Sequence, residues 1–93
     1  MLFHVEMTVN MPQDMPKDEA EALKAKEKAL AQQLQRDGKW LHLWRIAGRY
    51  ANVSIFDVKD NDELHNLLSS LPLWPFMEIT VVPLAQHPSA IKN

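Results

Sequence analysis

Hydrophobic and polar residues alternate at the start of the chain, and the spacing becomes helical farther along. Over residues 2–11, LFHVEMTVNM, every second side chain is apolar and most of those between are polar. This alternation predicts a strand with one buried face. From Pro16 to about Arg36 the pattern predicts a helix, because proline suits a first helical turn and acidic residues follow it. Asp37 and Gly38 are typical of the end of such a helix.

The second half of the chain predicts two more strands, a short helix and a last strand. WLHLWRIAG (40–48) and YANVSIFDV (50–58) are predicted strands joined around Gly48-Arg49. Asp60 and Glu63 resemble a capping box at the start of a second helix. The apolar stripe of that helix consists of Leu64, Leu67, Leu68 and Leu71. LPLWPF is then a rigid loop, and MEITVVPLA (77–85) is predicted to be the last strand.

The predicted order is β-α-β-β-α-β. Over 93 residues this is the order of a ferredoxin-like α+β domain, an antiparallel sheet with two helices on one face. We therefore expect residues 1–93 to form a single domain of this type. Trp40, Trp44, Tyr50 and Phe56 cannot all face the two helices. The second face of the sheet is thus expected to carry aromatic surface, which favours an oligomer.

Composition argues against several classes of function. A net charge of -2 and a pI near 6.0 do not suit a nucleic-acid-binding protein. No apolar run approaches the roughly 20 residues that span a bilayer, so we expect no membrane partner. The absence of cysteine fits a reducing cytoplasm. Two glycines cannot build a phosphate-binding loop or a dinucleotide fingerprint, and no histidine pair has helical metal spacing, so we predict no cofactor and no metal.

A carboxylate interrupts the apolar stripe of the first predicted helix. The stripe consists of Ala20, Leu23, Leu30 and Leu34. The position that completes it holds Glu27, and two interpretations follow. In one, Glu27 lies at the edge of the stripe and pairs with Lys24 or Lys28. In the other, Glu27 points beneath the helix into a pocket, where burial raises its pKa and a partner or ligand must compensate the charge. A carboxylate placed in that way is a candidate general base.

Two predicted strands supply further candidates. Arg45 interrupts an apolar strand and, with Arg49, could bind a carboxylate through a bidentate fork, the alternative being a salt bridge at an edge or interface. Tyr50, Asn52 and Ser54 share one strand face. Tyr50 and Asn52 could donate hydrogen bonds to a developing enolate oxygen, or the face could be a polar subunit contact.

The second predicted helix and the loop after it give two more candidates for substrate binding. His65 flanks the apolar stripe of that helix and could reach a pocket walled by Trp74 and Phe76. The alternative is that Trp74 and Phe76 belong to an ordinary core.

Five stretches of the chain, in order and covering nearly its whole length, resemble muconolactone Δ-isomerase. They are MLFHVEMTVNMP, LKAKEKALAQQLQRDGKW, HLWRIAGRYANVSIFDV, LPLWPFMEITV and HPSAI. The resemblance implies a ferredoxin-like subunit that needs no cofactor and assembles into a homodecamer in the bacterial cytoplasm. The implied reaction converts (S)-muconolactone to 3-oxoadipate enol-lactone, in the catechol branch of the β-ketoadipate pathway.

The implied reaction gives the candidate residues roles. It moves a proton from the γ carbon to the α carbon through a dienolate, so it needs a base, a donor for the oxyanion and a cation for the carboxylate arm of the lactone. We expect Glu27 to move the proton, Tyr50 or Asn52 to stabilise the oxyanion, and Arg45 or Arg49 to bind the carboxylate.

The sequence leaves one point of geometry and two other functions open. Tyr50 and Asn52 share a face, but the pattern does not say which one, and if they point away from the helices then His4, His42 or His65 are better donors. One alternative function is that of a related enzyme, a chloromuconolactone dehalogenase or a cofactor-free monooxygenase. The other is a non-catalytic module that binds a small molecule.

Overall fold

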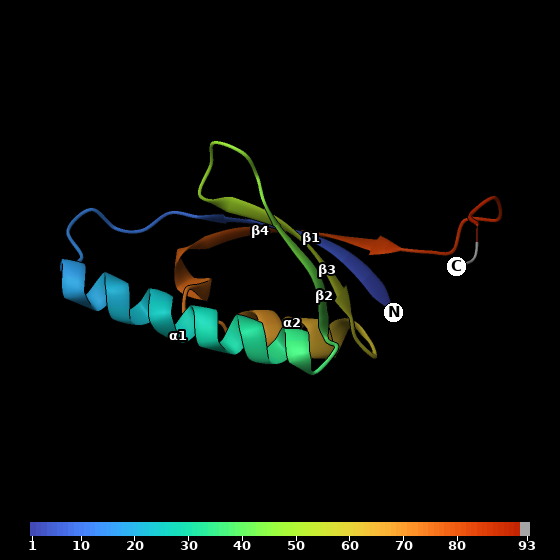
Figure 1. The fold of residues 1–93 in the computed structure, drawn as a ribbon, viewed down its shortest axis with the longest axis horizontal. Coiled ribbons are helices and arrows are strands. Elements are labelled where there is room, and N and C mark those ends of the chain that lie inside the picture. Colours follow the sequence, from blue (N-terminus) through green and yellow to red (C-terminus); the bar gives the residue numbers. More distant parts are fainter. Residues whose placement is uncertain (92–93) are drawn as a thin grey trace.

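Residues 1–91, which the computed structural model describes, follow the predicted order of strands and helices (Figure 1). The elements are β1 (Leu2–Val9), α1 (Lys17–Arg36), β2 (Trp40–Arg45), β3 (Ala51–Asp57), α2 (Asn61–Ser69), the short 3-10 helix η1 (Trp74–Phe76) and β4 (Met77–Leu84). The four strands form one antiparallel sheet in the order β2-β3-β1-β4, and both helices lie on the same side of it (Figure 1). The ferredoxin-like prediction is therefore confirmed.

The register of the sheet decides which side chains face the helices. β1 pairs with β3 so that Met7 lies opposite Asn52 and Val5 lies opposite Ser54. Directly opposed residues of an antiparallel pair point to the same side. Because Met7 and Val5 are fully buried, Asn52 and Ser54 also belong to the helix-facing side of the sheet.

The first strand ends two residues earlier than the alternation predicted. The backbone N–H of Val9 donates to the carbonyl of Tyr50 at 3.0 Å, and that of Asn10 donates to the carbonyl of Phe76 at 2.7 Å. Both neighbouring strands begin at this level, so the residues after Asn10 have no strand to pair with. Met11 therefore lies outside the sheet.

The connection between β2 and β3 is longer than predicted, because β2 ends at Arg45. The backbone N–H of Arg49 donates to the carbonyl of Ile46 at 3.1 Å and closes a turn. Gly48 adopts a φ of 80° in this turn, a backbone conformation that residues with a Cβ atom rarely adopt.

Half of the predicted capping box is present at the start of α2. The Asp60 side chain accepts a hydrogen bond from the backbone N–H of Glu63 at 2.9 Å, as expected. The Glu63 carboxylate does not return to Asp60. It accepts from the backbone N–H of Lys59 at 2.9 Å and from Lys39 Nζ at 3.2 Å, which ties α2 to the start of β2.

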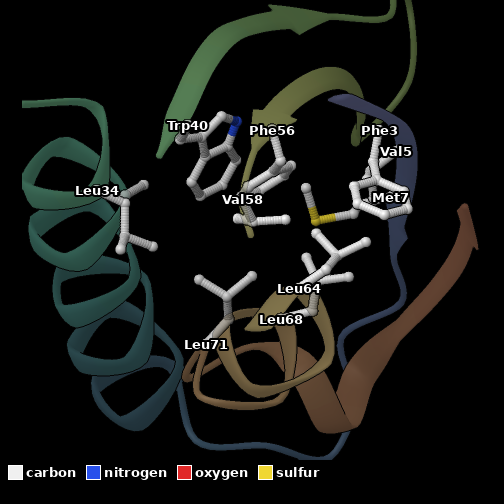
Figure 2. Close-up of a cluster of buried hydrophobic side chains, with 11 residues drawn as sticks. Phe3, Val5, Met7, Leu34, Trp40, Phe56, Val58, Leu64, Leu68 and Leu71 are labelled. Carbon is white, nitrogen blue, oxygen red and sulfur yellow. The ribbon is translucent and has the colours of Figure 1, made fainter. Parts of the chain in front are cut away.

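The hydrophobic core lies between the helix-facing side of the sheet and the two helices (Figure 2). Figure 2 shows Phe3 and Met7 of β1 directed toward Leu64 and Leu68 of α2. Trp40 stacks on Phe56 with ring centroids 4.7 Å apart. Of the four leucines predicted for the stripe of α2, Leu64, Leu68 and Leu71 are buried and Leu67 is partly buried. Each fully buried leucine contributes about 1.5–3 kcal/mol relative to an exposed one.

The outer face of the sheet, opposite the helices, carries the aromatic surface that the sequence predicted. Trp44 lies opposite Val53 on this face, remains 55% exposed, and stacks on His42 with ring centroids 5.0 Å apart. Val82 and Leu84 of β4 are also exposed. Within residues 1–91, neither helix has the length and apolar character needed to cross a bilayer.

Candidate active site

A pocket of about 440 Å³ lies between α1 and the helix-facing side of β2 and β3. Glu27 lines it from α1, Arg45 from the end of β2, Tyr50 from the residue before β3, and Asn52 from the start of β3. The structure thus brings together all three residues predicted to be catalytic and one of those predicted to bind substrate. The volume falls within the range of about 300–1,000 Å³ that is usual for sites that bind small molecules.

A bulge in β2 places Arg45 on the helix-facing side. Trp40 pairs with Phe56, but the next pair is His42 with Ile55, so Leu41 is an extra residue on β2. Without a bulge, alternation from Trp40 would put Arg45 on the outer face. With the bulge, Arg45 lies opposite Asn52 and faces the pocket.

Glu27 points beneath α1, as one of its two interpretations required. Its side chain is half-buried, and the backbone N–H of Leu73 donates to its Oε1 at 3.0 Å. Desolvation raises the pKa of Glu27, and the hydrogen bond from Leu73 lowers it by less. Within residues 1–91 no ion pair joins Glu27 to Lys24 or Lys28. The Glu27 carboxylate therefore faces the pocket with one neutral hydrogen-bond donor and no bound cation.

Two cations lie close to the ring of Tyr50. Lys24 Nζ and Arg45 Cζ are each 5.3 Å from the centroid of its ring. Desolvation raises the pKa of Tyr50, the positive charge of Arg45 lowers it, and the negative charge of Glu27 raises it. The phenol is therefore protonated at neutral pH and can donate a hydrogen bond. Among residues 1–91 its hydroxyl has no hydrogen-bond partner, so the donor is free for a ligand.

Two further polar groups lie at or beneath the floor of the pocket. Ser54 is fully buried, and its Oγ donates to Asn52 Oδ1 at 2.8 Å. Trp40 also lines the pocket, and its indole Nε1–H is buried without a hydrogen-bond partner in residues 1–91.

Three predicted substrate-binding residues lie elsewhere. The Arg49 guanidinium donates to Thr8 Oγ1 at 3.4 Å and does not line the pocket. His65 lines a second, smaller pocket of about 350 Å³ against β4, and Trp74 lines neither pocket. The structure therefore does not join His65 and Trp74 in one site.

The other histidines considered as alternative donors also lie outside the pocket. His4 and His42 both lie opposite Ile55, on the outer face of the sheet. Among residues 1–91, no cluster of three or more His, Asp or Glu side chains has a geometry suited to a metal ion.

Sequence reasoning missed two groups of the site. Lys24 was considered only as a salt-bridge partner of Glu27, although its position three residues earlier on α1 places it on the same face. The Leu73 N–H could not be predicted from the sequence, because almost every residue has a backbone N–H whatever its side chain. Its contact with Glu27 joins positions 46 residues apart.

Comparison with known proteins gives consistent matches over the whole chain. A family model described as muconolactone delta-isomerase matches residues 1–90. The chain is 61% identical over 92 residues to Muconolactone Delta-isomerase from Cupriavidus pinatubonensis, an alignment that covers 99% of this chain and 100% of the relative. It is 57% identical over 93 residues to Muconolactone Delta-isomerase 1 from Acinetobacter lwoffii, covering 100% and 97% of the two chains. A crystal structure of muconolactone isomerase matches with a TM-score of 0.95 at 58% identity, covering 100% of this chain and 97% of the other.

Proposed function

The chain belongs to the muconolactone Delta-isomerase family, and we propose that Glu27 is the base with which it isomerises its substrate. The reaction converts (S)-muconolactone to 3-oxoadipate enol-lactone in the β-ketoadipate pathway. The ring double bond shifts when the γ carbon loses a proton and the α carbon gains one. The intermediate is a dienolate whose negative charge lies largely on the lactone carbonyl oxygen.

The observation that carries this proposal is the environment of the Glu27 carboxylate. It is half-buried, it faces the pocket, and it accepts one hydrogen bond from the Leu73 N–H. Burial makes the carboxylate more basic than one in water, and the absence of a paired cation leaves that basicity intact. A single carboxylate above one face of the lactone ring removes the γ proton and, as the carboxylic acid, returns it to the α carbon.

The dienolate oxygen requires a hydrogen-bond donor near the plane of the lactone ring, clear of the ring face that the base occupies. The Tyr50 hydroxyl and the Asn52 carboxamide line the strand side of the pocket, whereas Glu27 reaches it from α1. Donors arranged in advance stabilise a developing oxyanion more than they stabilise the neutral carbonyl, and they therefore accelerate the reaction.

The carboxylate arm of the substrate requires a cation. Lys24, Lys28 and Arg45 line the pocket together with the single carboxylate of Glu27, so the lining is net positive. We assign the carboxylate arm to Arg45, because its guanidinium can form a bidentate pair and lies beside the Tyr50 ring. Binding the arm at Arg45 also limits its repulsion with ionised Glu27.

No cofactor takes part in this proposal, because the reaction moves a proton and leaves the oxidation level of the lactone unchanged. We propose further that residues 1–93 act as one domain and that the enzyme is a cytoplasmic homodecamer, as the resemblance of its sequence implies. The match of the family model to residues 1–90 supports the single domain. The exposed Trp44 and the stacked His42 on the outer face support a contact between subunits.

The test is the loss of muconolactone, followed by proton NMR, for the wild type and for Glu27→Gln. The glutamine keeps the length of the side chain and an oxygen for the Leu73 N–H, but it cannot take a proton. We expect kcat to fall by about 10²–10⁴-fold, the usual contribution of general acid–base catalysis.

Glu21→Gln is the matched control. Glu21 is an exposed glutamate on the same helix, and its replacement should leave kcat unchanged. A folded Glu27→Gln variant with wild-type turnover would refute the assignment of the base. Release of chloride from a chlorinated lactone, without turnover of muconolactone itself, would instead indicate the related dehalogenase.

A further inference from the structure

Asn52 can act as an oxyanion donor only if its carboxamide presents nitrogen to the pocket. An amide side chain has a donor end and an acceptor end of nearly the same shape, and turning it over exchanges them. With its oxygen toward the pocket, Asn52 would repel a dienolate. Some contact must therefore fix its orientation.

Ser54 provides that contact. Asn52 and Ser54 are two residues apart on β3 and share its helix-facing side, with Asn52 opposite Met7 and Ser54 opposite Val5. Ser54 is 0% exposed, and its Oγ donates to Asn52 Oδ1 at 2.8 Å. Asn52 lines the pocket, whereas Ser54 lies beneath it and does not.

The direction of this hydrogen bond follows from the surroundings of Ser54. Its cross-strand neighbours are Val5 and Leu43, which offer the hydroxyl no side-chain acceptor. Among residues 1–91 the only hydrogen bond that Ser54 Oγ donates is the one to Asn52 Oδ1. If the carboxamide turned over, its nitrogen would donate to Ser54 and the buried hydroxyl proton would have no acceptor. A buried donor without a partner is unfavourable, so the hydroxyl holds Oδ1 toward the core.

We propose that Ser54 is a positioning residue for the isomerisation. It keeps the Asn52 Nδ2 hydrogens directed into the pocket, where they meet the oxygen on which the dienolate charge develops. This inference rests on the proposed role of Asn52 as an oxyanion donor. It adds that the donor depends on a buried hydroxyl that never touches the substrate.

The experiment is a double-mutant cycle of Ser54→Ala and Asn52→Ala, with kcat and KM measured for muconolactone. Loss of an oxyanion donor costs about 10²–10³-fold in kcat, so we expect a loss of this size for Asn52→Ala. For Ser54→Ala we expect a kcat about tenfold lower with little change in KM, because the amide is then free to present either end. In the Asn52→Ala background, Ser54→Ala should have no further effect, because there is no amide left to orient.

Two results would overturn the inference alone. One is a Ser54→Ala variant with wild-type kcat. The other is a Ser54→Ala loss that persists unchanged in the Asn52→Ala background, which would mean that Ser54 acts through packing. An Asn52→Ala variant with wild-type kcat would instead overturn the role of Asn52 in the proposed function, and this inference with it.

Two further variants guard against effects on folding. Ser54→Cys keeps almost the same volume but donates weakly, so its kcat should also fall, and a folding failure of Ser54→Ala leaves the inference testable. Wild-type kcat in Ser54→Cys would count against the inference. Ser70→Ala removes an exposed serine hydroxyl that donates to Leu67 O at 2.6 Å, and it should keep the wild-type kcat.

Discussion

Replacing Tyr50 by phenylalanine removes one hydroxyl from the pocket and little else. The hydroxyl has no hydrogen-bond partner among residues 1–91, and the residue is 39% exposed. The ring contacts to Lys24 and Arg45, each at 5.3 Å, remain available to phenylalanine. We therefore expect the free energy of unfolding to change by no more than about 0.5 kcal/mol, as for most substitutions without a buried partner.

The effect on catalysis should be much larger. If the phenol donates to the dienolate oxygen, Tyr50→Phe should lower kcat by about 10²–10³-fold, which is the usual effect of losing one oxyanion donor. KM should change little, because the neutral lactone carbonyl is a weaker acceptor than the dienolate oxygen. Conversion of muconolactone by proton NMR gives kcat and KM, and circular dichroism on heating gives Tm.

Tyr50→Leu separates the hydroxyl from the ring. It also removes two cation–π contacts, each contributing about 0.5–1 kcal/mol at an exposed site, so it should lower both kcat and Tm. A Tyr50→Phe variant with wild-type kcat would refute the role of the hydroxyl and leave Asn52 as the oxyanion donor. A large loss of Tm in Tyr50→Phe would refute the reasoning that the hydroxyl has no structural role.

Three further predictions concern charge. Arg45→Met should raise KM for muconolactone by about ten- to a hundred-fold, as expected for a lost hydrogen bond to a charged group. Arg49→Met should leave KM unchanged, because Arg49 lies outside the pocket. Equal effects of the two substitutions on KM would contradict the assignment of Arg45. The pKa of Glu27 is raised above its ordinary value of 4.5. Because only the ionised carboxylate can act as the base, kcat/KM should rise with pH, and the midpoint of this rise should lie above pH 4.5. The native state binds the Glu27 proton more tightly than the unfolded state does, so the stability of the wild type relative to Glu27→Gln should fall as pH rises through the raised pKa. Urea unfolding at pH values below and above that pKa would measure this change. A stability that rises with pH instead would refute the desolvation argument.

The order and type of the elements could be predicted because each has a strong local pattern. Alternation in β1, the caps of α1 and the leucine stripe of α2 all act within a few residues. The fixed period of a helix also made it possible to recognise from the sequence that Glu27 interrupts an apolar stripe. Strand ends were less accurate. Met11 continues the alternation of β1, but pairing stops where β3 and β4 begin, and that depends on distant residues.

The composition of the pocket could be predicted only in part. Tyr50 and Asn52 both line the pocket, but the side of the sheet that Asn52 occupies follows from the pairing of β1 with β3. His65 was linked to Trp74 because both lie near α2 in sequence, although they do not line one pocket in space. The contact of Leu73 with Glu27 is made by a backbone group, which residue identity does not encode.

The bulge at Leu41 bears on how this chain tolerates insertions and deletions. Five positions separate Trp40 from Arg45, an odd number that would set them on opposite sides of a regular strand, and one unpaired residue brings them to the same side. If Leu41 were deleted, β2 would keep every pair with β3 and would become a regular strand without a bulge. Loss of Leu43 with the bulge retained would instead turn the Arg45 guanidinium toward the outer face. Relatives that differ in length within this strand should therefore differ at the bulge, because the number of residues between Trp40 and Arg45 decides which side of the sheet the guanidinium occupies.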